Sequence, residues 1–271
     1  MVQLKPKLSK RSIDFALHNP RIALGLLTGR SDYEEALRER IAKDVEFIRR
    51  KALPVGANPD FLELPPDEID SKLRMIAPAN TKRSWRLLNK WHAFLYAVTR
   101  AAKPVTVIET GVLYGHSSAS ILAGLEDNAA GRLISVDLPL KQHQSVICDG
   151  KHIQVGITTG KFAVGSAVPL ALRSRWNLQL GNSLELLPKI LNETGPISIF
   201  IHDSLHTYDH MMSEFELGYR ALDSGGLLIS DDIGYNSAWQ DFCKSKGEDW
   251  KILSKESETD DQFGFLIKSS K

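Results

Sequence analysis

The sequence predicts an α/β protein built on a doubly wound, mostly parallel β-sheet. From residue 105 onward, short and nearly continuous apolar runs alternate with segments whose apolar residues recur at helical spacing. Strands that are apolar along their whole length are typical of parallel sheets covered by helices on both faces. The right-handed crossover rule then favours a doubly wound arrangement. We expect strands at 105–108, 132–136, 176–180, 197–201 and 226–230.

The carboxyl-terminal region departs from this alternation. The helical segment "SAWQDFCKSK" is followed by "WKIL" and "FGFLIK", two apolar runs joined by a polar link with no helix between them. Strands joined in this way pair antiparallel, because a parallel pair needs a long crossover connection. We therefore expect an antiparallel pair at this end of the sheet.

Two further segments stand outside the alternating region. Residues 1–103 are predicted to form a helical amino-terminal extension, in which the capping-box sequence "SDYE" precedes apolar residues at helical spacing. The α/β domain then covers residues 104–271. Residues 139–175 are long and glycine-bearing for a connection between strands, which indicates either a lid over a ligand or a surface insertion.

Composition excludes several classes of protein. The chain has 34 basic and 33 acidic residues and a formal net charge of +1, which argues against binding nucleic acid or an anionic membrane through bulk electrostatics. Its two cysteines, Cys148 and Cys243, form no CxxC pair, so a disulfide framework is not expected. No signal peptide and no apolar run of the roughly 18 residues needed for a membrane span are visible. We expect a soluble, cytoplasmic protein.

Polar residues at the carboxyl ends of the first two strands predict a ligand site, because open parallel sheets bind ligands there. Gly111 and Gly115 allow a tight turn, and Ser117 lies at the start of the next helix, where backbone N–H groups are free. The spacing is not that of a dinucleotide fingerprint or a P-loop, and helix–strand packing alone would also explain the glycines. Asp137, which ends the second strand, could accept hydrogen bonds from both ribose hydroxyls of an adenosine ligand.

The third strand is followed by two more polar residues. Asn182 and Ser183 could contact an adenine edge, or they could cap the helix that begins there.

Three acids and a histidine follow the fourth and fifth strands. Asp203 and His206 come just after 197–201, and Asp231 and Asp232 end the next strand. Three converging carboxylates repel one another unless one is protonated or a hard cation such as Mg²⁺ or Ca²⁺ lies between them. Two readings without a metal stay open: His206 could cap the helix starting near residue 208, and the adjacent aspartates could be a capping acid with a solvated neighbour.

Five blocks of the sequence together resemble a known family. They are "ETGVLYGHSSASIL", "LISVDLP", "LGNSLELLP", "IFIHDSLHTYDHMMSEFE" and "LDSGGLLISDDI". Over residues 104–268 the chain resembles the class I S-adenosylmethionine-dependent methyltransferases, and within them the branch of the macrocin-type sugar O-methyltransferases. The resemblance implies a Rossmann-like sheet of seven strands in which the last is antiparallel.

The resemblance also implies roles for single residues. Glu109, Gly111 and Asp137 are expected to contact S-adenosylmethionine, with Asp203 at the same edge. Asp203, Asp231 and Asp232 are expected to hold Mg²⁺ or another hard divalent cation, and His206 to be the general base.

The sequence thus predicts a metal-assisted O-methyltransferase acting on a small polyhydroxylated acceptor, a sugar or a glycosylated metabolite. Methyl transfer is an in-line displacement that depends on positioning, while a metal and His206 would remove the proton of the acceptor hydroxyl. Three alternatives remain: a metal-independent methyltransferase with His206 alone as base, a metal-dependent hydrolase or oxygenase, and a module that binds the cofactor without chemistry. The amphipathic helices near the amino terminus also leave a homo-oligomer open.

Overall fold

The computed structural model describes residues 90–139, 145–148, 151–154, 159, 162–248, 250–254 and 262–269. Of the helical extension predicted for residues 1–103, only the last helix, α5 (Lys90–Ala102), lies within these ranges. The remainder of that prediction, and part of the one made for 139–175, lies outside the described residues.

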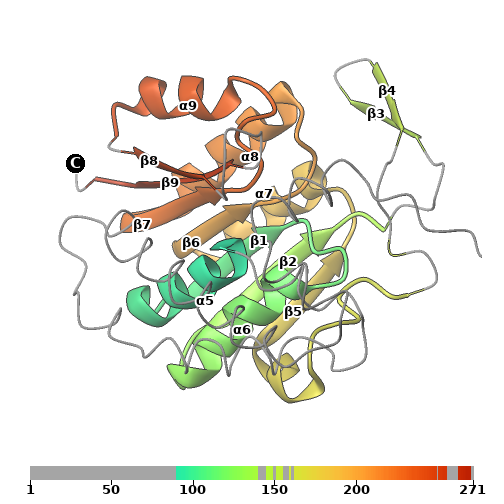
Figure 1. Cartoon of the computed structure of the whole chain (residues 1–271), viewed down its shortest axis with the longest axis vertical. Coiled ribbons are helices and arrows are strands. Elements are labelled where there is room, and N and C mark those ends of the chain that lie inside the picture. The colour runs from blue at the N-terminus through green and yellow to red at the C-terminus, as the bar shows by residue number, and fades with distance from the viewer. Residues whose placement is uncertain are drawn as a thin grey trace, which may run out of the picture.

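The described strands form one seven-stranded sheet with the order β5-β2-β1-β6-β7-β9-β8 (Figure 1). The first five in the chain, β1, β2, β5, β6 and β7, pair parallel, whereas β9 pairs antiparallel with both β7 and β8. The predicted mostly parallel sheet and the antiparallel last strand are therefore confirmed. The strands are β1 (Thr106–Thr110), β2 (Arg132–Asp137), β5 (Trp176–Leu180), β6 (Ile197–His202), β7 (Leu222–Ser230), β8 (Trp250–Ser254) and β9 (Gln262–Ile267).

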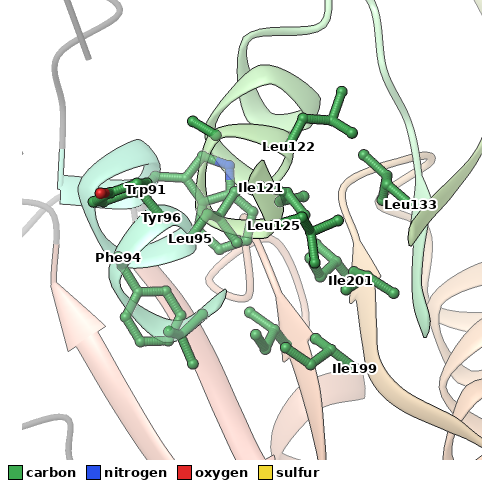
Figure 2. Packing of buried hydrophobic residues seen from close by; sticks show 14 of the residues in the cluster. Trp91, Phe94, Leu95, Tyr96, Ile121, Leu122, Leu125, Leu133, Ile199 and Ile201 are labelled. Atoms are coloured by element: carbon green, nitrogen blue, oxygen red, sulfur yellow. The ribbon is translucent and has the colours of Figure 1, made fainter. Parts of the chain in front are cut away.

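Helices cover both faces of this sheet, as its apolar strands predict. The helices after α5 are α6 (His116–Asp127), α7 (Ser183–Thr194), α8 (Tyr208–Ala221) and α9 (Ala238–Lys246). Neighbouring residues of one strand enter different cores: Val107 packs with α5 and α6, and Ile108 packs with α7, α8 and α9. Figure 2 shows the first core, where Trp91 and Leu95 of α5 lie against Ile121 and Leu125 of α6.

One close contact fixes α8 on the sheet. A Cβ added to Gly218 would stand only 2.4 Å from Cγ of Phe200, a buried residue of β6. No other residue can bring the helix backbone this near to the strand, because real Cβ contacts do not become so short. The close approach matters for the site, since α8 carries buried polar residues that reach the ends of β1 and β6.

The region predicted as an irregular insertion contains regular structure. Strands β3 (Ser145–Cys148) and β4 (Lys151–Gln154) pair antiparallel in a small separate sheet, and the 3₁₀ helix η3 (Leu170–Arg175) leads into β5. The function of this region as a lid stays a prediction.

Candidate active site

The strand order reverses between β1 and β6, and the candidate site lies at their carboxyl ends. The chain passes from β1 outward to β2 and β5, and then returns to β6 on the other side of β1. Ligands of open α/β sheets bind at such a reversal, where neighbouring loops diverge. The predicted site residues follow β1, β2, β5, β6 and β7, so the topology brings all of them to one edge.

Both glycines after β1 have left-handed backbone and touch other backbone segments. Gly111 has φ 84° and Gly115 has φ 89°. A Cβ on Gly111 would lie 1.9 Å from the carbonyl oxygen of Asp203, and one on Gly115 would lie 2.9 Å from Cα of Gly165. These glycines are thus required by loop-to-loop contact, and helix–strand packing does not account for them.

Asp137 holds the same loop from the side of β2. Its Oδ2 accepts hydrogen bonds from the backbone N–H groups of Val112, at 2.7 Å, and Leu113, at 3.0 Å. The side chain is partly buried, and within the described ranges no donor reaches Oδ1. One carboxylate oxygen therefore shapes the glycine loop, and the other is the atom that a ribose hydroxyl could reach. Contact with the cofactor itself stays a prediction.

Glu109 lies beneath the start of α6. It is completely buried, and its carboxylate accepts hydrogen bonds from the hydroxyls of Ser117, Ser118 and Ser135 at 2.6–2.7 Å. Burial raises the pKa of Glu109, and the serine hydrogen bonds only partly oppose this effect. The described contacts of Glu109 and of the Ser117 side chain therefore connect β1, β2 and α6. The direct cofactor contacts expected of these two residues stay predictions.

At the end of β5 one open alternative is resolved. Asn182 is the N-cap of α7, and its Oδ1 accepts a hydrogen bond from the backbone N–H of Leu184 at 3.0 Å. Ser183 is buried, and its hydroxyl lies 3.4 Å from Nε2 of His210. Capping by Asn182 is confirmed, and an adenine contact from either residue stays a prediction.

His206 lies between β6 and α8, next to an exposed aromatic ring. Its imidazole stacks on the ring of Tyr235 with centroids 5.4 Å apart and an interplanar angle of 27°. The N-cap of α8 is Thr207, so the alternative in which His206 caps this helix is wrong. Tyr235 is 58% exposed, which places the His206–Tyr235 stack where an acceptor could meet it.

The two aspartates after β7 occupy a turn. Asp231 is buried, and Asp232 has a left-handed backbone with φ 51°. The N-cap of α9 is Ser237, so the alternative in which one of these acids caps that helix is also wrong. The turn that a shared metal would require is present at Asp232.

The described donors do not, however, form a metal centre. Within the described ranges, no group of three histidine, cysteine, aspartate or glutamate side chains is arranged to hold a metal ion. Asp203, Asp231 and Asp232 follow two neighbouring strands, but among the described residues they form no such group. The expected Mg²⁺ site does not fit this arrangement, and we assign no chemical step to a metal.

A further acid with several hydrogen bonds lies at this edge, and the sequence did not lead us to it. Glu214 of α8 is completely buried and contacts Thr110, His202, Ser204 and His210. A signal for it exists in the sequence, since an acid lies on the apolar stripe of α8 beside Met211 and Phe215. It also lies four residues after His210, within side-chain reach on a helix.

Comparison with known proteins agrees with this geometry. Residues 108–233 match the Methyltransf_24 family, described as a methyltransferase domain. These residues form a methyltransferase domain. The enzyme class expected from the sequence, an S-adenosylmethionine-dependent methyltransferase, is thereby confirmed at the level of the domain. Among curated proteins, no sequence matches the chain.

Two solved structures align with most of this chain. An O-methyltransferase from Bacillus cereus in complex with SAH aligns with a TM-score of 0.50 and 15% identity, over 84% of this chain and 97% of that one. The O-methyltransferase TomG from Streptomyces achromogenes, which is involved in tomaymycin synthesis and was solved with SAM, aligns with a TM-score of 0.47 and 16% identity. That alignment covers 86% of this chain and 99% of TomG. At such identity the first of these alignments establishes the fold alone.

No helix among the described residues of the methyltransferase has the length and apolar character that a membrane crossing requires. The cytoplasmic location, the absence of nucleic-acid partners and a homo-oligomer stay predictions.

Proposed function

We propose that the chain is an S-adenosylmethionine-dependent O-methyltransferase that methylates a hydroxyl of a small polyhydroxylated acceptor, a sugar or a glycosylated metabolite. The observation that carries the proposal is the glycine loop after β1, which Asp137 holds on one side and the backbone of Asp203 contacts on the other. The match to a methyltransferase domain covers this loop and extends to the turn after β7. The SAH named for the Bacillus cereus structure supports the same choice of cofactor.

In this proposal the cofactor lies across the carboxyl ends of β1, β2 and β5. The remaining oxygen of Asp137 accepts from the ribose, and the segment around Asn182 lies near the base. S-adenosylmethionine supplies an electrophilic methyl group on a positively charged sulfur. The residues of this chain have to hold that group in line with the acceptor oxygen, because positioning is the main source of acceleration in such a displacement.

His206 is the proposed general base. The acceptor oxygen forms a bond to the methyl carbon while the carbon–sulfur bond breaks and its electron pair stays on sulfur. The hydroxyl proton passes to His206, whose ring is held in place by stacking on Tyr235. This is the metal-independent alternative, and it uses only groups that the described edge brings together.

The choice of a sugar-like acceptor derives from the five sequence blocks that resemble the macrocin-type branch. The exposed ring of Tyr235 beside His206 is suited to cover one face of such an acceptor. A hydrolase or an oxygenase lacks support, since the described residues offer no group of three histidine, cysteine, aspartate or glutamate side chains that could hold a metal ion.

Calorimetry with S-adenosylmethionine, in the presence of Mg²⁺ and again after chelation with EDTA, tests the cofactor and the metal together. We expect binding in both conditions. A folded protein that binds the cofactor in neither condition would contradict the proposal, and binding only with Mg²⁺ would restore the metal-assisted reading. Methyl incorporation into a panel of sugars, glycosides and catechols then tests the acceptor. Transfer to catechols alone would overturn the sugar assignment, and tight binding without any transfer would favour the binding module.

A further inference from the structure

A buried carboxylate with four side-chain donors lies behind the proposed site. Oε2 of Glu214 accepts from Oγ1 of Thr110 and lies 2.6 Å from Nδ1 of His202. Oε1 accepts from Oγ of Ser204 at 3.0 Å and lies 2.9 Å from Nε2 of His210. An isolated buried charge is very costly, but a full set of donors makes it tolerable.

The donors keep this group ionised. Burial on its own would raise the pKa of Glu214, yet the charges and hydrogen bonds of His202 and His210 outweigh it and hold the pKa well below the usual value. A carboxylate only accepts hydrogen bonds, so all four neighbours must donate. His202 therefore carries its proton on Nδ1, and His210 carries a proton on Nε2.

The fixed proton on His202 determines what the other side of its ring can do. With the proton on Nδ1 fixed, Nε2 is the second nitrogen of the ring, which accepts in the neutral imidazole and donates in the imidazolium. This atom is buried and has no hydrogen-bond partner among the described residues. The ring of His202 also stands edge-on to the ring of His206, with centroids 5.3 Å apart and an interplanar angle of 84°. Glu214 thus determines which nitrogen of His202 carries the proton and where the His202 ring lies. That ring is in contact with His206, the proposed base.

The same carboxylate connects the loops that carry the proposed cofactor site. Thr110 immediately precedes Gly111, and His202 and Ser204 stand on either side of Asp203. His210 extends the network to Ser183 at the start of α7. One buried charge on α8 is therefore bonded, directly or through one histidine, to three of the chain segments that meet at this edge.

We propose that Glu214 is a positioning residue of methyl transfer, which holds the ends of β1 and β6 and orients His202 so that His206 and the Gly111 turn keep their reactive geometry. This inference rests on the proposed function for the role of His206. A misplacement of about 1 Å costs roughly 100-fold in rate, and outer partners of site residues are commonly worth about 10- to 100-fold. Losses of that size are within easy reach of measurement.

The variant Glu214→Gln keeps the shape of the side chain but removes its charge and turns one acceptor into a donor. We expect kcat to fall about 10- to 100-fold, while KM for the acceptor changes much less. Glu216→Gln is the matched control, since Glu216 lies on the same helix and its ion pairs within the described part of the chain are with Arg220 and Lys246 at the surface. We expect wild-type kcat from the control.

A merely structural role would lower the thermal stability of Glu214→Gln without changing kcat of the folded enzyme. Both variants are therefore assayed well below their melting temperatures. Wild-type kcat in folded Glu214→Gln would overturn the proposal. Should this variant fail to fold, Ser204→Ala and Thr110→Val remove one donor each, and we expect a smaller loss of kcat from each of them. Wild-type kcat in both would overturn the proposal as well.

Imidazole ¹⁵N–¹H correlation spectra give a readout that does not depend on turnover. We expect the proton of His202 on Nδ1 in the wild type and a changed distribution in Glu214→Gln. A wild-type His202 with its proton on Nε2 alone would overturn the positioning role even if the enzyme is active. An enzyme that gives the expected spectra but transfers a methyl group to no acceptor would instead contradict the proposed function.

Discussion

Gly111 and Asp203 lie in backbone contact across the gap between the ends of β1 and β6. A single methyl group on Gly111 would stand 1.9 Å from the carbonyl oxygen of Asp203 and 2.4 Å from its carbonyl carbon. The contact is made by backbone on both sides, so no side-chain movement can relieve it. The two loops that flank the proposed cofactor site can therefore lie this close only with glycine at position 111.

Gly111→Ala should accordingly abolish cofactor binding and destabilise the fold. The left-handed backbone at φ 84° alone costs an alanine about 1–2 kcal/mol, and the backbone clash adds to this. Gly225→Ala is the control, because Gly225 has φ 79° but nothing within 4 Å of its added Cβ. Calorimetry and thermal melts of both variants distinguish the cost of the left-handed backbone, which both share, from the cost of the clash with Asp203, which only Gly111→Ala has. Equal behaviour of the two variants would mean that the contact with Asp203 is unimportant.

Asp137→Asn should weaken S-adenosylmethionine binding about 10- to 100-fold, because hydrogen bonds to a charged group contribute roughly 1.5–3 kcal/mol. The amide also presents a donor where the Val112 and Leu113 N–H groups need an acceptor. Asp127→Asn, at the far end of α6, removes a carboxylate that accepts from Tyr96 and should leave the affinity unchanged. Titration calorimetry measures both, and an unaltered dissociation constant for Asp137→Asn would remove this residue from the cofactor site.

His206→Gln should lower kcat about 100- to 10,000-fold, the range over which a general base contributes, with cofactor affinity retained. Tyr235→Phe keeps the aromatic stack on His206 and should preserve most of the activity. Single-turnover methyl transfer is the measurement that isolates the chemical step. Near-normal turnover by His206→Gln would assign the base to another residue.

The stability conferred by Glu214 should depend on pH in a defined direction. Its pKa in the folded chain lies well below the usual 4.5, so its contribution is complete above pH 4.5 and is lost as the pH falls through the folded value. The difference in unfolding free energy between wild type and Glu214→Gln should shrink in acid. Denaturant titrations from pH 7 to pH 3 measure this difference. A difference in unfolding free energy that grows in acid would contradict the prediction.

Glu109 should show the opposite slope. Burial raises its pKa above 4.5, so the folded chain holds the proton more firmly than the unfolded chain does. The stability linked to this group is present below pH 4.5 and is lost as the pH rises through the folded value. Glu109→Gln should remove that slope while keeping the acceptor for at least one serine. Unfolding curves in which Glu109→Gln follows the wild type at every pH would show that Glu109 does not titrate differently on folding.

The sheet was predictable because the sequence itself shows the apolar strands and the helical segments that alternate with them. The middle of β1 contacts an apolar core on each face, through Val107 on one side and Ile108 on the other, which favours a continuous apolar run there. The site edge was predictable for a related reason, since the loops that follow parallel strands necessarily meet at one side of the sheet. The hairpin β3–β4 was not predicted, because "SVIC" and "KHIQ" are too short and too mixed in polarity to show the period of a strand.

The details of the site depend on contacts that no local pattern contains. The role of Glu214 arises only when α8 is laid on β6 closely enough for its carboxylate to meet Thr110 and His202. The metal centre was inferred from the place of the aspartates after neighbouring strands, but a metal site also needs side chains that converge, which strand order alone does not determine. For Asn182 the sequence left capping and an adenine contact open, and only its distance to the N–H of Leu184 established the cap.

The position of β9 between β7 and β8 has a consequence for how the protein is made. During synthesis, β7 emerges from the ribosome well before β9, so it exposes an unpaired edge until residues 262–267 are available. Exposed strand edges recruit other chains and promote aggregation. A nascent chain stalled before this last strand should therefore be a preferred client of chaperones, and the order of translation itself becomes a constraint on yield.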